Sequence, residues 1–265
     1  MADHDFDPGY SDRFAGVGRV LGVQALHRLR AAHIAVIGIG GVGSWTAEAL
    51  ARTGVGHVTL IDLDDVCVTN TNRQVLALSD TVGKPKVHVM RDRMLAISPD
   101  MQVDAIQDFY TPDNADQLLA LGFDVVVDAI DAYRDKLDLI RRAKQKRMPL
   151  VVVGGAGGRS DPTRIQRADL NRTHGDALIK RIRRDLRGQP NFPRERAWRI
   201  PTIYTDEERR FPGDDGEPCA TATKNARMDC REGLGALTWV TGTMGLFAAS
   251  AAVELLHKNA AKSAS

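Results

Sequence analysis

Short, mostly apolar runs recur along the chain up to Val153, and most of them end at a glycine or an acidic residue. These runs are His33–Ile37, His57–Ile61, Gln102–Ile106, Phe123–Val127 and Leu150–Val153. Runs of this length without strict polar alternation are typical of strands that are buried on both faces of a parallel sheet. The pattern therefore predicts five such strands.

The segments between these runs have helical composition. They are the amphipathic Val20–Leu29, Ser44–Arg52 with Gly54 placed to end it, Pro85–Ile97, a segment opened by Pro112, and Tyr133–Arg147. Strands that alternate with helices predict a doubly wound, mostly parallel α/β sheet with right-handed crossovers. In such a sheet, ligands bind beyond the carboxyl ends of the strands.

The pattern changes after about Ser160. Residues 180–199 are dense in arginine, 189–215 are rich in proline, glycine and charge, and 236–256 form an apolar segment. We therefore expect three parts: an N-terminal helical arm over 1–30, a nucleotide-binding domain over 31–158, and a C-terminal elaboration over 159–265. The elaboration carries the basic stretch and a terminal apolar helix.

The apolar segment Ala236–Leu256 is long enough to cross a membrane. It nevertheless contains Thr238, Thr241 and Ser250, and Glu254 lies near its end. We expect a terminal helix that packs on the core and on a partner subunit, without stable membrane insertion.

Composition bounds the remaining possibilities. Of 265 residues, 43% are hydrophobic and 26% are charged, which are ordinary globular values, and the net charge of +2 decides nothing. The three cysteines, Cys67, Cys219 and Cys230, include no C-x-x-C pair. This argues against a disulfide framework and a structural zinc site. The acidic segment Met1–Tyr10 lacks the order of a secretory signal, so we expect a reduced, cytoplasmic compartment.

The first motif with a chemical meaning is glycine-rich and follows the first strand. Gly38, Gly40, Gly41 and Gly43 form a G-x-G-G-x-G sequence before a helix, and Asp62 ends the next strand. Glycines let the backbone approach a phosphate at a helix N-terminus, and the carboxylate is placed for ribose hydroxyls. The motif predicts a Rossmann-like site for an adenine nucleotide. Taken alone it favours NAD, and hence an oxidoreductase.

The polar residues after Asp62 favour ATP instead. Asp64, Asn70, Asn72, Arg73 and Lys86 follow in the sequence, and Asp131 comes after the fourth strand. Cleavage of ATP develops negative charge on the α-phosphate and pyrophosphate, which fixed cations stabilise. A carboxylate at this edge can hold Mg²⁺ on the phosphates. The whole set predicts an ATP-cleaving enzyme, although each residue alone could be a loop charge or a cap.

The chain resembles the ThiF/MoeB/HesA family, the bacterial relatives of ubiquitin-activating enzymes. The residues that carry the resemblance are Gly38–Gly43, Asp62–Asp64, Asn72–Gln74, Gly83–Lys86 and Asp128–Asp131. The resemblance implies that Asp62 binds the ribose of ATP, that Asn70, Arg73 and Lys86 contact its phosphates, and that Asp131 coordinates Mg²⁺. It places Asp64 and Asn72 in the same ATP site.

The resemblance also implies an assembly. Family members are homodimers or pseudo-dimers in which an N-terminal arginine reaches into the partner's site. Arg19, or alternatively Arg13, is the candidate for this role. Partner sulfurtransferase proteins are compatible with the resemblance.

Within the family, the absence of C-x-x-C pairs argues against activation of a ubiquitin-like sulfur carrier, which is the alternative function. Cys67–Gln74, Gly154–Gly158, Asp161–Thr163 and Arg227–Cys230 resemble instead the tRNA threonylcarbamoyladenosine dehydratase branch. This resemblance implies ATP-dependent cyclisation through an acyl-adenylate. One departure is Thr205 in place of a serine, which retains the hydroxyl. Cys230 either takes part in the chemistry or is a small buried residue.

A basic stretch gives the tRNA inference separate support. It consists of Lys180, Arg181, Arg183, Arg184, Arg187, Arg194, Arg196 and Arg199. Clustered cations outside the nucleotide site are the electrostatic footprint of phosphate-backbone binding. Asp185 and Glu195 dilute the run, so a solvated helix face is the alternative.

Overall fold

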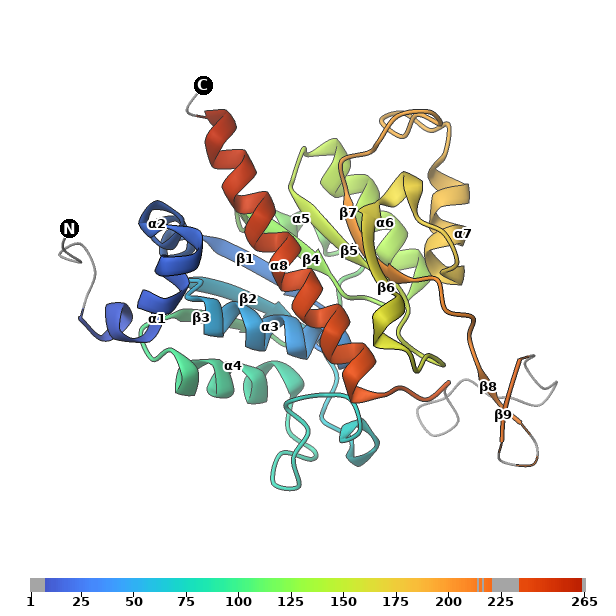
Figure 1. Cartoon of the computed structure of the whole chain (residues 1–265), viewed down its shortest axis with the longest axis horizontal. Helices are drawn as coiled ribbons and strands as arrows, with labels where there is room; N and C mark the ends of the chain where they lie inside the picture. Colours follow the sequence, from blue (N-terminus) through green and yellow to red (C-terminus); the bar gives the residue numbers. More distant parts are fainter. Residues whose placement is uncertain (1–7, 214, 216, 221–233, 264–265) are drawn as a thin grey trace.

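A computed structural model describes residues 8–213, 215, 217–220 and 234–263. Its main sheet has seven strands in the order β3-β2-β1-β4-β5-β7-β6 (Figure 1). The strands are β1 (His33–Ile37), β2 (His57–Ile61), β3 (Gln102–Ile106), β4 (Val125–Asp128), β5 (Leu150–Val153), β6 (Ile165–Asp169) and β7 (Pro201–Thr205). All neighbouring pairs are parallel except β6 and β7. The predicted α/β class with a mostly parallel sheet is confirmed.

Eight α-helices occur in the described part of the chain. They are α1 (Pro8–Leu21), α2 (Val23–Ala31), α3 (Gly41–Thr53), α4 (Lys86–Ile97), α5 (Ala115–Leu119), α6 (Tyr133–Gln145), α7 (Ala177–Leu186) and α8 (Thr238–Ser263). The short elements are η1 (Val68–Asn70), η2 (Pro162–Arg164), η3 (Leu170–Arg172) and the strands β8 (Phe211–Pro212) and β9 (Pro218–Cys219).

The expected helix over Val20–Leu29 is wrong in one respect, because the chain breaks there. Gly22 has φ +91°, a conformation that L side chains rarely adopt, and it separates α1 from α2. The expected helix after Pro112 begins only at Ala115.

Strands β6 and β7 were not expected from the sequence. Strand β6 lies at the edge of the sheet and, among the described strands, pairs only with β7. It carries polar residues that are not fully buried, such as Gln166 and Arg167. An edge strand of this kind lacks the apolar run that marks a central strand. Residues 159–265 thus complete the same sheet that residues 31–158 begin.

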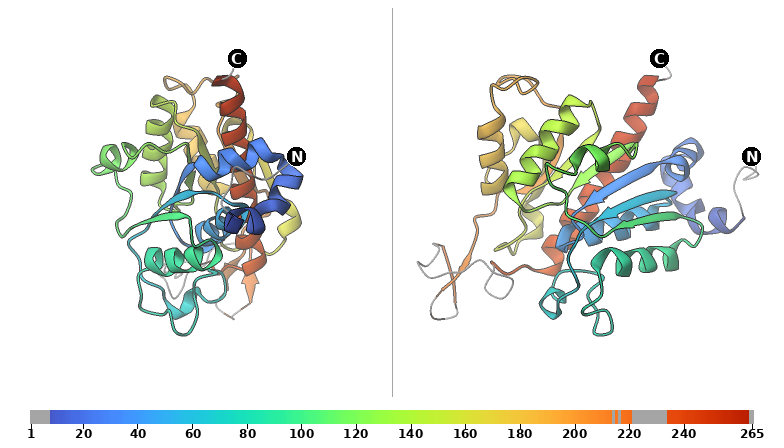
Figure 2. Two further views of the ribbon diagram at one scale, coloured as in Figure 1. Left: turned by 90° about the vertical axis from the view of Figure 1, so that its left-hand side faces the viewer. Right: turned by 180° about the vertical axis from the view of Figure 1, so that it is seen from behind.

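Alternate residues of the strands point to two separate cores. Ile34 and Val36 of β1 pack in a cluster with residues of α3, α4 and α8, whereas Ala35 and Ile37 pack with residues of α5, α6 and α7. The views from opposite sides show these helices covering the two faces of the sheet (Figures 1 and 2). The sheet is therefore buried on both faces. The carboxyl ends of its strands are where a ligand site is expected.

Helix α8 runs across one face of the sheet (Figure 1). In the described chain, Thr238–Lys258 is long and apolar enough to cross a membrane, with mean hydropathy 1.4, and 56% of that window is buried inside the protein. Its residues Val240, Met244 and Ala248 belong to the core. The helix therefore packs on the core, as expected from the sequence.

Helices α3 and α8 approach closely because α8 has glycines where they meet. A Cβ on Gly245 would lie 2.6 Å from Cβ of Trp45 and 2.7 Å from the carbonyl oxygen of Val42. A Cβ on Gly242 would meet only the Trp45 ring, at 3.8 Å. Position 245 therefore has no room for a side chain, whereas position 242 has.

We predict that Gly245→Ala lowers the free energy of unfolding by about 1–3 kcal/mol, because the added methyl group forces the two helices apart. Gly242→Ala is the matched control on the same helix. It should be neutral or stabilising by up to about 1 kcal/mol, because alanine favours the helix. Urea denaturation of both variants checks this, and equal stabilities would contradict it.

Candidate active site

The glycine-rich loop between β1 and α3 lies at the C-terminal edge of the sheet. Gly38 has φ +90°, and a Cβ there would lie 2.9 Å from the carbonyl oxygen of Ala129. A Cβ on Gly43 would lie 1.8 Å from the carbonyl oxygen of Gly38. A Cβ on Gly40 would meet nothing within 4 Å. Two glycines thus fold the loop tightly, and the third leaves the open space that a phosphate needs.

Asp62 fixes this loop to the end of β2. Its side chain is buried, and its carboxylate accepts hydrogen bonds from the backbone N–H groups of Ile39 at 2.6 Å and Asp64 at 2.9 Å. Burial raises the pKa of Asp62, while the nearby Lys86 opposes the rise. The carboxylate therefore lies beside the glycine-rich loop, where the sequence predicts a ribose contact.

Lys86 begins α4 next to two of the predicted ATP ligands. Its Nζ lies 2.7 Å from Oδ2 of Asp64, and only 5% of the residue is exposed. Its positive charge also opposes the rise that burial causes in the pKa of Asp62. The lysine is thus held at the site entrance by Asp64, whose side chain is half exposed.

Arg73 is held over the start of α3. Its Nη1 donates to the carbonyl oxygen of Thr69 at 2.7 Å and to Oδ1 of Asn72 at 3.0 Å. A Cβ on Gly41 would lie 3.6 Å from Cδ of Arg73. The aliphatic part of the Arg73 side chain therefore passes beside the glycine-rich loop, and its phosphate contact stays a prediction.

The backbone of Arg73 is anchored independently of its side chain. Its carbonyl oxygen accepts hydrogen bonds from Nε1 of Trp45 at 3.2 Å and from Oγ1 of Thr241 at 3.1 Å. These contacts join the loop to α3 and α8, so the loop does not depend on the guanidinium for its position.

The two asparagines make structural contacts in this structure. Asn70 is buried, and its Oδ1 accepts the backbone N–H of Cys67 at 3.0 Å, which caps η1. Asn72 donates from Nδ2 to the carbonyl oxygen of Ala236 at 2.8 Å. Asn72 therefore orients Arg73 and ties its loop to the segment before α8. The phosphate contact of Asn70 and the place of Asn72 in the ATP site remain predictions.

Beyond β4, Asp131 is an exposed loop residue at the same edge of the sheet. The end of β4 carries a buried ion pair that the sequence pattern did not predict. Nζ of Lys136 lies 2.7 Å from Oδ1 of Asp128, and neither side chain is exposed to solvent. Oδ1 also accepts the N–H of Ile130 at 3.1 Å, so the pair holds the loop that carries Asp131. Lys136 shares the buried face of α6 with Leu139 and Ile140, a spacing that could have revealed it.

The glycine-rich segment after β5 is supported by a second group of residues that the sequence analysis did not name. Oδ2 of Asp176 accepts the N–H of Gly155 at 2.9 Å, and Oδ1 caps α7. The buried Arg159 donates to the carbonyl oxygens of Gly155 and Glu207. Thr205 accepts the N–H of Glu207 through its hydroxyl, at 3.1 Å, so this hydroxyl shapes the turn after β7.

The segment that leads into α8 connects the two loops. Gly158 donates its N–H to the carbonyl oxygen of Gly235 at 3.0 Å, and Nε1 of Trp239 donates to the carbonyl oxygen of Ser160 at 2.8 Å. Asn72 binds the same segment from the other side. The Arg73 loop and the loop after β5 therefore both contact the segment that leads into α8.

Within one chain, Arg19 lies away from this site. It is an exposed residue of α1, and Gly18 beside it packs against Leu26 of α2, which leads into the N-terminal end of β1. The glycine-rich loop follows the other end of β1. Arg13 is also exposed on α1 and donates to the carbonyl oxygen of Ile97 at 3.3 Å.

Two of the cysteines lie in the described chain. Cys67 is exposed, and a hydrogen bond from the Thr69 hydroxyl lowers the pKa of its thiol. Cys219 lies in β9. Cys230, with Arg227–Asp229, lies outside the described residues.

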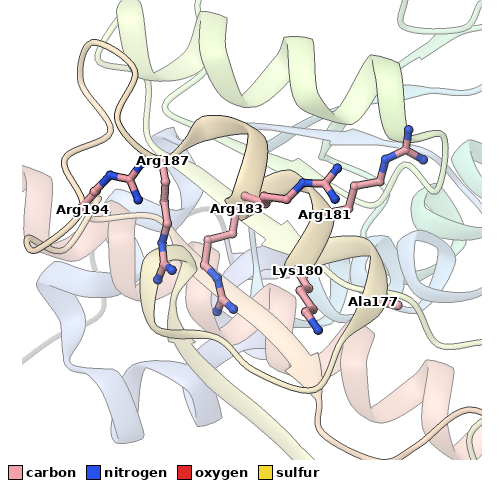
Figure 3. Close-up of a pocket in the computed structure, with 7 residues that line it drawn as sticks. Ala177, Lys180, Arg181, Arg183, Arg187 and Arg194 are labelled. Carbon is pink, nitrogen blue, oxygen red and sulfur yellow. The ribbon is translucent and has the colours of Figure 1, made fainter.

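The basic stretch forms a cavity of about 760 Å³ (Figure 3). The cavity is lined by Ala177, Lys180, Arg181, Arg183, Arg184, Arg187 and Arg194. Several of these cations have local partners. Arg183 donates to Oγ1 of Thr173 at 3.2 Å, and Arg187 donates to Oδ1 of Asn171 at 2.9 Å.

The remaining cations of the stretch are exposed, as Arg187 is. Arg181 lies over the ring of Tyr133, 3.8 Å from its centroid, and Arg184 pairs with Asp185 at 2.8 Å. Arg196 and Arg199 are exposed on the following loop and do not line the cavity. The structure thus gathers six of the eight predicted cations on one surface.

Comparison with known proteins gives one consistent result. The sequence profile of the ThiF family matches residues 11–264. A tRNA threonylcarbamoyladenosine dehydratase from Haemophilus influenzae is 46% identical over 251 residues, which cover 94% of this chain and 95% of that protein. The Escherichia coli protein of the same description is 45% identical and covers 96% of each chain.

The solved structures agree with the sequences. The structure described as TcdA (CsdL) has a TM-score of 0.87 and 42% identity, over 97% of this chain and 98% of that chain. The E. coli tRNA N6-threonylcarbamoyladenosine dehydratase in complex with ATP has a TM-score of 0.84 and 41% identity, with the same coverage.

Proposed function

Because the chain belongs to the ThiF family, we propose that it uses ATP to dehydrate N6-threonylcarbamoyladenosine in tRNA to its cyclic form. The observation that carries the proposal is the position of Arg73 beside the glycine-rich loop and of Lys86 against Asp64, in a chain that matches an ATP-bound dehydratase over nearly its whole length. Two cations at this loop suit ATP cleavage, and hydride transfer does not require them.

In the first step, the threonyl carboxylate attacks the α-phosphorus of ATP and the bond to pyrophosphate breaks. Negative charge grows on the α-phosphate and on the leaving group, and Arg73 and Lys86 stabilise it. Lys86 turns from Asp64 toward the phosphates, which the exposed position of Asp64 allows. The products are an acyl-adenylate and pyrophosphate.

In the second step, the carbamoyl nitrogen or oxygen of the same side chain attacks the activated carbonyl carbon. The bond to AMP breaks, and the carbamoyl group loses a proton from one of its N–H groups. Both reacting groups belong to one side chain, so the step has the rate advantage of an intramolecular reaction. The ring therefore closes without an enzyme nucleophile, and Cys230 is not required for it.

The residues also fit a magnesium ion. The Asp131 carboxylate is exposed at the phosphate edge of the sheet, and oxygen ligands of this kind suit Mg²⁺, which neutralises phosphate charge when bound. Asp131 would hold the ion together with the phosphates. We also propose a cytoplasmic location, where tRNA and ATP are both present.

Mass spectrometry of tRNA nucleosides tests the proposed function. The purified protein with ATP should convert threonylcarbamoyladenosine in tRNA to a product lighter by one water, with release of pyrophosphate that depends on the tRNA. Pyrophosphate release that depends instead on a protein ending in Gly-Gly would favour carrier activation, and a reduced nicotinamide would favour an oxidoreductase.

We further propose a homodimer in which Arg19 completes the partner's site. Exposed apolar side chains flank it: Val20 is 82% exposed and Val23 is 52% exposed at the turn between α1 and α2. On α8, Trp239 is 52% exposed and Leu246 is 53% exposed. Apolar surface of this kind is typical of a protein–protein contact. A second copy that packs against this turn would lie against Arg19, and Arg19 could then enter the site of that copy.

The basic cavity on α7 is the proposed contact with the tRNA backbone. Arg183 and Arg187 bind residues outside α7, whereas Arg184 pairs with the adjacent Asp185 at the exposed surface of the helix. We therefore predict that the RNA contacts come mainly from Lys180, Arg184 and Arg194. Replacing these three with alanine should weaken tRNA binding, leave ATP affinity unchanged, and reduce the slope of log affinity against log salt by about 2–3. Filter binding at several salt concentrations measures both quantities.

A control variant keeps the same change in net charge. Arg91, Lys146 and Lys258 are exposed cations that pair with acidic residues elsewhere on the surface. Their replacement with alanine should leave the salt dependence close to that of the wild type. If both triple variants bind tRNA alike, the cavity is not the contact surface.

A further inference from the structure

The carboxylates of two acidic residues beside the segment Gly154–Gly158 bind neighbouring groups of the protein. Asp176 caps α7, accepts the N–H of Gly155 and lies 3.7 Å from the guanidinium of Arg159. The Glu207 carboxylate accepts the N–H groups of Ser160 and Asp161 and the hydroxyl of Ser160, at 2.9–3.0 Å. Although burial raises it, these hydrogen bonds hold the pKa of Glu207 below its ordinary value.

A second guanidinium at this segment, that of Arg209, remains uncompensated. A Cβ on Gly155 would lie 2.5 Å from Nη2 of Arg209, so the guanidinium lies against the backbone of the segment. Its Nε is buried, and no acceptor among the described residues lies within hydrogen-bonding distance of it. A buried donor of this kind costs free energy unless a partner arrives.

The two arginines here differ in what they do. Arg159 is buried and donates to two backbone carbonyl oxygens, and burial lowers the pKa of its guanidinium, with the charge of Arg209 adding to the effect. Arg159 is therefore part of the framework. Arg209 is half-buried and adds a positive charge that no described carboxylate binds.

The position of Arg209 relates it to the ATP site. Strand β5 is separated from β1 only by β4, so the segment after β5 and the glycine-rich loop lie at the same edge of the sheet. The segment also contacts the lead into α8, which Asn72 binds from the Arg73 side. Arg209 therefore lies against a segment at the sheet edge that also carries the glycine-rich loop, and both this segment and the Arg73 loop contact the lead into α8.

We propose that Arg209 binds the carboxylate of the substrate side chain and holds it for attack on ATP, an inference that rests on the proposed function. The reaction must bring a carboxylate against a phosphate, and two anions approach only where cations offset their repulsion. Arg73 and Lys86 serve the phosphate, and a planar guanidinium can take both oxygens of a carboxylate at once. Among the described cations of the segment after β5, Arg209 lies against the backbone with a buried Nε that lacks a partner, which suits it to that task.

Steady-state kinetics with Arg209→Ala tests this. We expect kcat/KM for threonylcarbamoyl-tRNA to fall by roughly 10- to 100-fold, the loss expected for one hydrogen-bonded charge, with ATP affinity unchanged. Arg209→Lys keeps the charge but loses the second donor, so it should recover part of the activity. Arg210→Ala is the matched control, because the exposed Arg210 hydrogen-bonds the segment through its backbone N–H, at 2.8 Å from the carbonyl oxygen of Gly158.

A binding measurement separates this role from a structural one. The probes are the nucleoside N6-threonylcarbamoyladenosine and its methyl ester, titrated into the protein with a non-hydrolysable ATP analogue. The wild type and Arg210→Ala should prefer the free acid by about tenfold or more, and Arg209→Ala should bind both compounds equally. If the wild type forms product but Arg209→Ala keeps its kcat/KM and its preference for the acid, the inference is wrong. If the wild type forms no product, the proposed function itself fails.

Discussion

Replacing Arg73 with alanine should lower the rate of tRNA-dependent pyrophosphate release by about 10²–10³-fold, the usual cost of losing one fixed donor to developing charge. The fold should survive, because the backbone carbonyl of Arg73 keeps its hydrogen bonds to Trp45 and Thr241. Pyrophosphate assays and thermal unfolding measure the two effects. An active variant would remove Arg73 from the mechanism.

The same variant tests the shared site. Arg73→Ala chains mixed with Arg19→Ala chains should regain part of the activity, because a heterodimer would contain one site with both arginines. Each variant alone serves as the control. Subunit exchange without any recovery would mean that Arg19 does not complete the partner's site.

Replacing Lys136 with methionine should cost about 3–5 kcal/mol of unfolding free energy, because it leaves the Asp128 carboxylate buried without its counter-charge. Both side chains are fully buried, and Oδ2 of Asp128 already lacks a partner among the described residues. Lys146→Met is the control, since the partly exposed Lys146 pairs with Asp116 at the surface. Its effect should stay within about 0.5 kcal/mol.

The cost should depend on pH. Burial raises the pKa of Asp128, and removal of Lys136 raises it further. A carboxyl whose pKa is higher in the folded state favours folding at low pH and loses that contribution as the pH rises. The stability deficit of Lys136→Met should therefore be small near pH 4 and grow toward pH 7. Urea denaturation across this range measures it, and a deficit that is independent of pH would contradict the explanation.

The sequence predicts the central strands well because a strand buried on both faces must be apolar throughout, as in Val125–Val127. It fails at β6, since an edge strand tolerates Gln166 and Arg167 and depends on β7, more than thirty residues later, for its pairing. The same limit applies to the helical arm, which a single glycine divides.

The candidate site divides in a similar way. Residues that follow a strand directly, such as Asp62, could be placed from the strand pattern alone. The sequence cannot tell whether Asn70 is a ligand or a cap, because the same amide serves either role. Nor does the sequence predict that Arg209 lies beside Gly155, because that contact depends on the pairing of β7 with β5.

The segment that leads into α8 contacts both loops of the candidate site, and it can therefore couple the binding free energies of ATP and tRNA. Asn72 holds it from the nucleotide side, and Gly158 and Ser160 hold it from the side of the segment after β5. Any free energy with which ATP orders this shared segment is free energy that the tRNA no longer has to supply. By thermodynamic reciprocity, the factor by which ATP tightens tRNA binding equals the factor by which tRNA tightens ATP binding.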